Sequence, residues 1–156
     1  VEMEVTNEGL RIQLVETRTS LFFDSGSANL KPGAKLLLKT IAEKLKTVHN
    51  PIVIEGHTDS RPLGRAGGYS NWELSADRAN AARRAMEAAG MDSKQIANVR
   101  GYADRKLKMP DDPFHFSNRR VSILVASSKL DKVQENTESE HPESEHTKKE
   151  HTETEH

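Results

Sequence analysis

The chain of 156 residues is long enough for one folded domain and short for two. Hydrophobic residues make up 34% of it and charged residues 30%, the balance of a polar globular domain, and the absence of cysteine excludes disulfide bridges, thiol catalysis and cysteine-ligated metals. No apolar run approaches the roughly 18 residues that span a bilayer, and no signal peptide is visible. Because the chain begins at Val1, we expect it to be a piece of a longer protein.

Charge is divided unevenly along the chain. Residues 131–156 contain nine acidic residues and three lysines, a net charge of −6, whereas the remaining 20 basic and 15 acidic residues give residues 1–130 a net charge of +5. A mildly basic domain favours an anionic polymer but is not basic enough to indicate nucleic acid. Because the end of the chain is nearly free of apolar residues, we predict a folded domain over residues 1–129 and a disordered acidic, histidine-containing tail over residues 130–156.

The first third of the chain predicts a hairpin and then a helix. Apolar and polar residues alternate over Val1–Val5 and over Leu10–Leu14, with a turn at Asn7–Gly9 between them. The run Ser20–Asp24 extends the second strand or forms another short one. A helix is predicted to begin at Lys31-Pro32-Gly33 and to end at Asn50-Pro51. Its buried face is expected to consist of Leu37, Ile41, Leu45 and Val48.

The middle of the chain alternates strand and helix. The apolar run Ile52–Ile54 predicts a strand covered on both faces, and Gly56–Gly68 reads as a loop. Ser70 and Glu73 have the spacing of a capping box, which predicts the start of an alanine-rich helix. That helix runs to Ala89, and Gly90 is expected to cap it in the left-handed conformation.

Two further strands, Ile96–Tyr102 and Val121–Ala126, are separated by a proline-containing loop over Met109–Phe116. The resulting order is β-hairpin, α, β, α, β, loop, β. It predicts the α+β class, as a two-layer sandwich in which a mixed β-sheet carries both helices on one face.

The candidate site is a pair of opposite charges on neighbouring elements. Asp59 follows an apolar strand, and Arg78 lies inside the helix beyond the glycine-rich loop. Such a pair suits a zwitterion, because Asp59 can accept from an ammonium group while the planar guanidinium of Arg78 grips a carboxylate. Asn71 and Leu74 share the helix face of Arg78, and the first-turn amides of that helix can donate to an anion.

The residues alone also allow structural roles. Asp59 can cap the loop, and Arg78 can pair with Glu73, Asp77 or Asp59 itself. His57 and Asp59 could form a metal pair, but no third or fourth ligand has a familiar spacing, so we predict no metal. No serine lies in a nucleophile elbow and no phosphate loop is present, so we predict neither an enzyme nor a cofactor.

The segments GLRIQLVE, GHTD, SNWELSADRAN and NRRVSILV resemble the OmpA-like peptidoglycan-binding domains, over nearly all of Gly9–Val125. Within that family, SNWELSADRAN and the long loop before it resemble the periplasmic domains of flagellar stator proteins of the MotB type. The resemblance implies non-covalent binding of the cell-wall peptide, centred on diaminopimelate. It also implies a periplasmic location, a homodimer and, in the full-length protein, a MotA-like membrane channel partner, with no role for nucleic acid.

Two alternatives remain beside the stator interpretation. The same fold occurs in outer-membrane lipoproteins and in domains attached to porins, where it links the outer membrane to the wall. A cell-wall amidase or peptidase that uses His57 and Asp59 would need a metal or nucleophile that the sequence does not show.

The resemblance also assigns residues by motif. The predicted ligand-binding residues are Thr58, Asp59, Asn71, Leu74, Arg78, Arg119 and Arg120. We expect one of the two last arginines to pair with a loop acid and the other to face solvent or ligand. Trp72 is expected to anchor the start of its helix by packing, with sugar stacking as the alternative. Many relatives carry an F-D-F-D-type run where this chain has Phe23–Gly26, so the second aromatic and the second acid are absent. Alanine at Asp59 or Arg78 is expected to abolish wall binding with little change in melting temperature.

Overall fold

The computed structural model describes residues 1–127, so the predicted end of the domain at residue 129 and the predicted tail over residues 130–156 lie outside the described part. Five strands form one mixed sheet in the order β1-β2-β5-β3-β4. The strands are β1 (Glu2–Thr6), β2 (Gly9–Val15), β3 (Ile52–His57), β4 (Ile96–Gly101) and β5 (Arg120–Ala126). β3 and β4 are parallel, and the other neighbours are antiparallel.

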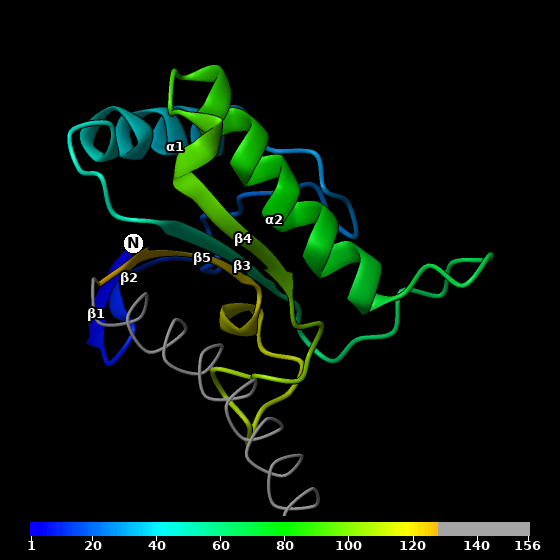
Figure 1. Cartoon of the computed structure of the whole chain (residues 1–156). Coiled ribbons are helices and arrows are strands. Elements are labelled where there is room, and N and C mark those ends of the chain that lie inside the picture. Colours follow the sequence, from blue (N-terminus) through cyan, green and yellow to red (C-terminus); the bar gives the residue numbers. More distant parts are fainter. Residues whose placement is uncertain (128–156) are drawn as a thin grey trace, which may run out of the picture. The chain divides into compact units, whose positions relative to one another are not determined.

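Two α-helices, α1 (Pro32–Leu45) and α2 (Asn71–Ala88), cover one face of this sheet, as Figure 1 shows. Two short 3-10 helices, Ser93–Gln95 and Phe116–Asn118, precede β4 and β5. The predicted α+β two-layer arrangement is confirmed. Of the helices in residues 1–127, none has the length and apolar character needed to cross a membrane.

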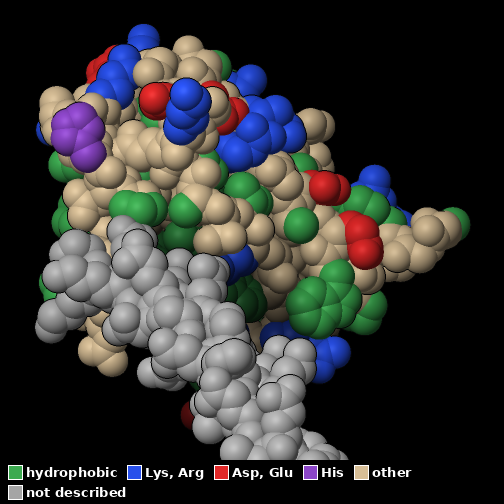
Figure 2. Space-filling model, viewed as in Figure 1, with side chains coloured by type: hydrophobic (Ala, Val, Ile, Leu, Met, Phe, Trp, Pro, Cys, Tyr) green, Lys and Arg blue, Asp and Glu red, His purple; other side chains and the backbone are tan. Residues whose placement is uncertain are grey.

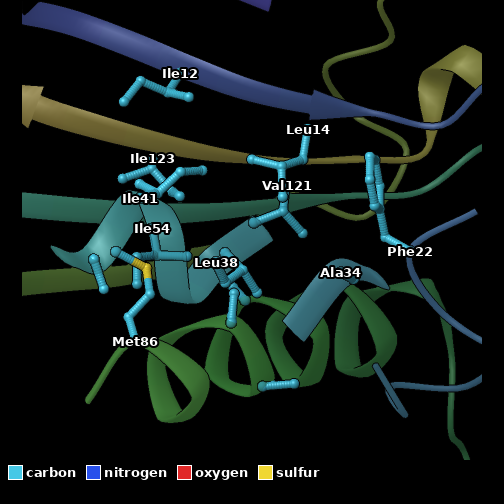
Figure 3. Packing of buried hydrophobic residues seen from close by; sticks show 14 of the residues in the cluster. Ile12, Leu14, Phe22, Ala34, Leu38, Ile41, Ile54, Met86, Val121 and Ile123 are labelled. Atoms are coloured by element: carbon cyan, nitrogen blue, oxygen red, sulfur yellow. The ribbon is translucent and has the colours of Figure 1, made fainter. Parts of the chain in front are cut away.

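The core lies between the sheet and the two helices. Strand alternation points every second side chain of the central strands toward the helices, and these residues are apolar. Figure 3 shows Ile12 and Leu14 of β2, Ile54 of β3, and Val121 and Ile123 of β5 facing the helices. The helices contribute Leu38, Ile41 and Met86 to the same core.

Three sequence-based expectations for residues 20–51 are wrong in detail. The helix ends at Leu45, before Asn50-Pro51, so Val48 lies outside it. Its buried residues are Ala34, Leu38, Ile41, Ala42 and Leu45, whereas Leu37 is only half-buried. Small alanines allow α1 to lie close to its neighbours, which turns the buried face away from Leu37. The run Ser20–Asp24 forms no strand, and only Phe23 makes an isolated bridge, with Leu30.

The start and end of α2 follow the predicted capping. The Ser70 hydroxyl accepts from the Trp72 amide, and the Glu73 carboxylate accepts from the Ser70 amide, so the capping box is confirmed. Gly90 has φ +101°, the left-handed conformation expected after the helix. β3 continues through His57, so the loop begins at Thr58 and not at Gly56.

Glycines in two neighbouring strands let the first half of α2 approach the sheet. A Cβ atom on Gly56 would lie 2.0 Å from the Ser75 carbonyl oxygen, and one on Gly101 would lie 2.7 Å from the Ala76 amide nitrogen. Ser75 strengthens this contact, because its hydroxyl accepts from the Ala103 amide at 2.9 Å. The Ala103 carbonyl in turn accepts from the Thr58 amide. The helix face that carries Arg78 is thereby fixed beside the end of β3.

Candidate functional site

A hollow of about 800 Å³, here called the groove, lies where β3 ends beside the first half of α2. Its walls come from residues 21–27, from the loop after β3 and from α2. Six of the seven predicted ligand-binding residues line it: Thr58, Asp59, Asn71, Leu74, Arg78 and Arg119. The seventh, Arg120, does not line the groove.

Arg78 is the unusual charge of the groove. The residue is only 4% exposed, yet no carboxylate oxygen of residues 1–127 lies within 4.0 Å of its guanidinium. Its Nε donates to the Ser27 carbonyl at 2.9 Å, and its guanidinium carbon lies 4.8 Å from the centre of the Phe23 ring. Burial lowers the pKa of Arg78 below its ordinary value, and the nearby Glu16 carboxylate counteracts part of that effect. The ion pairs with Glu73, Asp77 or Asp59 that the sequence left open do not form.

Asp59 is paired instead with Arg119. One Asp59 oxygen accepts from Nη1 of Arg119 at 2.7 Å, and the other accepts from the Arg61 amide at 2.9 Å. Nε of Arg119 donates to the buried Glu16 carboxylate, also at 2.7 Å. Burial alone would lower the pKa of Arg119, but the hydrogen bonds that it donates to Glu16 and Asp59 raise its pKa above the ordinary value. The expectation that one of the two arginines pairs with a loop acid is met by Arg119.

The other groove residues shape the floor and one wall. The Asn71 side-chain amide donates to the Arg61 carbonyl at 3.0 Å and more weakly to the Asp59 carbonyl at 3.3 Å, which ties the loop to α2. The Thr58 hydroxyl donates to the Asp59 carbonyl at 2.9 Å. Leu74 is 2% exposed and supplies an apolar surface beside Arg78. The groove therefore combines the buried Arg78 guanidinium, which has no carboxylate partner within residues 1–127, with the paired carboxylates of Asp59 and Glu16 and an apolar floor.

Sequence reasoning missed the wall that residues 16–27 provide. Glu16 follows β2 directly, and its second oxygen accepts from the Phe22 amide at 2.9 Å, which holds the segment against the groove. Phe23 and the carbonyl groups of Asp24 and Ser27 then surround the Arg78 guanidinium. The absence of the second aromatic and acid therefore does not remove this segment from the groove. The available signal was Phe23, an aromatic residue directly before an acid, Asp24.

Arg120 lies on the other face of the sheet, here called the open face because α1 and α2 do not cover it (Figure 1). Successive residues of a strand point to opposite faces, so Arg119 and Arg120 cannot both enter the groove. Arg120 donates to the side-chain carbonyl of Gln13 and to the backbone carbonyl groups of Asn118 and Lys106. Burial lowers its pKa to about 10.

His57 also lines a hollow on the open face, where its ring stacks on that of Tyr102 at 5.0 Å between ring centres. Asp59 lies in the groove, so the two residues do not form the dyad that an amidase would need. Burial, followed by the charges of Arg120, Lys106 and Arg11, lowers the pKa of His57 to about 3. The imidazole is therefore neutral at neutral pH.

The depressed pKa of His57 predicts acid sensitivity. Between about pH 3 and pH 6.5, His57 binds a proton in the unfolded chain but not in the folded chain. The free energy of unfolding therefore falls as the pH is lowered through this range. The slope from one such group is at most about 1.4 kcal/mol per pH unit. Urea denaturation at several pH values should show a shallower slope for His57→Phe, which keeps a ring against Tyr102 but cannot titrate. Equal slopes for the two proteins would contradict the assignment.

Trp72 does not anchor the helix start as expected. It is 47% exposed, and the guanidinium carbon of Arg105 lies 5.5 Å from its ring centre. The helix start is held by the capping box instead, which leaves Trp72 on the surface.

In the view of Figure 2, Lys and Arg side chains are interspersed with Asp and Glu side chains, the pattern of solvated helix faces.

Comparison with known proteins places this fold and groove in a family. The model of the OmpA family matches residues 22–120, which include the groove-lining residues from Phe23 to Arg119. The chain therefore belongs to the OmpA family.

Within the family, the chain is similar to proteins of flagellar motility. It is 38% identical to Motility protein B of Escherichia coli (strain K12) over 143 residues, which cover 90% of this chain and 46% of that protein. The periplasmic domain of Helicobacter pylori MotB superposes with a TM-score of 0.71 at 23% identity, over 90% of this chain and 99% of that one. The chain is also 31% identical to the Peptidoglycan-associated lipoprotein of Pseudomonas putida, over 67% of this chain and 61% of that protein. It spans about half the length of the motility proteins that it matches.

Proposed function

We propose that this chain binds peptidoglycan without cleaving it, through the diaminopimelate residue of the stem peptide, and so anchors a flagellar stator protein to the cell wall. The observation that carries the proposal is Arg78. A guanidinium that is 4% exposed, opens on a groove and has no carboxylate partner within residues 1–127 is a strong site for an anionic ligand. Membership in the OmpA family and the similarity to Motility protein B support the same conclusion.

The groove matches the head group of an amino acid. The carboxylate of the ligand would accept hydrogen bonds from Nη1 and Nη2 of Arg78, because Nε of Arg78 already donates to the Ser27 carbonyl. The ammonium group of the ligand would lie against the Asp59 carboxylate, which Arg119 holds in place. Because Arg119 is shared with Glu16, one positive charge faces two carboxylates, and the cluster of three keeps a net negative charge. The side chain of the ligand would lie along Leu74. The groove thus offers a complementary group to each part of the head group.

Diaminopimelate carries the second such head group that lysine lacks. If Arg78 and Asp59 receive that group, a ligand without it leaves both charges unpaired, and the loss of affinity is large. The expected result is that free diaminopimelate displaces the chain from diaminopimelate-type sacculi at a concentration at least about tenfold lower than lysine does. The measurement is co-sedimentation with purified sacculi, with each amino acid as competitor.

The same experiment tests the non-covalent character of the binding. Sacculi recovered after incubation should release no peptides or sugars, because His57 and Asp59 lie in different hollows. Equal competition by lysine and diaminopimelate would refute the proposed ligand. Release of wall fragments that stops on addition of a chelator would refute the proposed mode of action.

We further propose that the parent protein is periplasmic over this domain, dimeric, and associated with a MotA-like channel in the inner membrane. The support for a dimer is the edge strand β1. Val1, Met3 and Val5 are 63%, 70% and 86% exposed, and one edge of the strand has no partner within the described sheet. An exposed apolar edge strand is a ready surface for a second copy.

The alternative is a domain that links the outer membrane to the wall. The similarity to the Peptidoglycan-associated lipoprotein supports this alternative, and both interpretations use the same groove. The parent sequence upstream of Val1 discriminates between them: one apolar helix carrying an aspartate indicates a stator, and a lipidated cysteine indicates a lipoprotein.

A further inference from the structure

The open face of the sheet contains a second hollow, of about 270 Å³, that the groove does not use. Strand register builds it, because Arg120 lies opposite His57 and Ser122 lies opposite Glu55 on adjacent strands. Tyr102, Lys106 and Lys108 from the segment after β4 close one side. The hollow is therefore a polar depression on the face of the sheet opposite α1 and α2.

Two side chains in this hollow, His57 and Ser122, are buried, and each has a polar atom without a hydrogen-bond partner within residues 1–127. His57 is 5% exposed and its Nδ1 makes no hydrogen bond, and Ser122 is 1% exposed and its hydroxyl oxygen makes none within residues 1–127. Buried polar atoms are almost always hydrogen-bonded, because an unpaired one loses its water without compensation. His57 and Ser122 are diagonal neighbours on adjacent strands, a separation of roughly 7–8 Å between their backbones.

The charges around these two side chains are unbalanced. Arg11, Lys106, Lys108 and Arg120 contribute four positive charges, against two carboxylates, Glu4 and Glu55, so the net charge of the lining is +2. Glu55 is already bonded to Arg11 at 3.0 Å and Arg100 at 3.3 Å. Lys106 and Arg120 have no carboxylate within 4.0 Å among the described residues. The excess positive charge also helps to keep His57 neutral, so that one ring nitrogen can serve as a donor.

We propose that this hollow is a second ligand site, which binds an oxyanion such as a phosphate or carboxylate group. Lys106 and Arg120 supply the charge. The Ser122 hydroxyl and the His57 imidazole donate hydrogen bonds to the anion, which satisfies both unpaired groups at once. The site lies on the opposite face of the sheet from Arg78, so it can be filled while the groove holds its own ligand.

The probe is inorganic phosphate, titrated into the full chain and followed by 15N and imidazole NMR. Saturable shifts are expected at His57, Ser122 and Lys106. Ser122→Ala removes a hydroxyl that makes no hydrogen bond within residues 1–127, so its melting temperature should stay within about 1–2 °C of the wild type while its phosphate affinity falls severalfold. Lys106→Gln should weaken binding about tenfold. Ser127→Ala is the matched control, because its hydroxyl also lacks a partner within residues 1–127 but does not line the hollow.

Sedimentation of the same variants with sacculi identifies the source of the anion. Loss of wall binding in Lys106→Gln and Ser122→Ala would mean that the anion belongs to the wall, and unchanged sedimentation would mean that it is a free ion. Both results are compatible with the site. The proposal is overturned if phosphate shifts only groove residues, if no shift saturates, or if both variants bind phosphate with wild-type affinity.

Discussion

Replacing Arg78 with lysine is expected to weaken binding to diaminopimelate-type sacculi by about 2–3 kcal/mol, or roughly 30- to 150-fold. Lysine keeps the positive charge but loses the planar pair of terminal nitrogens that can hold both oxygens of a carboxylate. It also loses the Nε hydrogen bond to Ser27 and the flat contact with Phe23, which together aim the charge into the groove. Co-sedimentation over a range of sacculus concentrations measures the change.

Arg84→Lys is the matched control for that substitution. Arg84 lies on the same helix, is exposed and does not line the groove, so both wall binding and stability should be unchanged within about 0.5 kcal/mol. Wild-type sedimentation of Arg78→Lys would show that the ligand binds elsewhere. Alanine is a poorer probe than the sequence suggested, because Arg78 is buried and its removal leaves a cavity and the Ser27 carbonyl without its donor.

Alanine at Gly56 is expected to destabilise the domain by about 3 kcal/mol or more, and so to lower its melting temperature by roughly 10–20 °C. The new methyl group would lie 2.0 Å from the Ser75 carbonyl oxygen, which is backbone and cannot rotate away. The first half of α2 would have to lift from β3, and Arg78 would move with it. Thermal unfolding followed by circular dichroism measures the loss.

Gly33→Ala provides the contrast within the same protein. Gly33 is in the first turn of α1, has nothing within 4 Å of a new Cβ and does not have a positive φ. The same change there should be neutral or should stabilise by about 0.5–1 kcal/mol, because alanine favours the helix and restricts the unfolded chain. If the two variants unfolded at the same temperature, the close approach of α2 to β3 would not have the role assigned to it.

The elements of this fold could be predicted from sequence where local chemistry decides them. Alternation marked the hairpin, the apolar run at Ile52–Ile54 marked the central strand, and the pair Ser70 and Glu73 marked the start of α2. The prediction for α1 was less good, since leucine spacing favoured Leu37 whereas alanines and Leu38 form the buried face. Apolar periodicity does not distinguish two overlapping helix faces when the packing partner is unknown.

The candidate site was predictable only in part. The resemblance identified Asp59, Arg78 and Arg119, but not that Arg119 joins Asp59 to Glu16 across 60 and 103 residues of sequence. Contacts of such separation depend on which strands become neighbours, and no local pattern encodes that. The sequence prediction placed Arg119 and Arg120 in one site, whereas adjacent residues at a strand start face opposite sides of the sheet, so only Arg119 lines the groove.

The position of β3 has a mechanical consequence for the wall-anchoring role proposed above. Thr58 and Asp59 follow β3 directly, and this strand is hydrogen-bonded along both edges, to β5 and to β4. Tension applied to the groove along the strand would load both ladders in shear, so that many hydrogen bonds must rupture together. A groove attached to an edge strand would instead peel away one bond at a time. Under the proposed anchoring role, a load directed along β3 would therefore be resisted by both ladders at once.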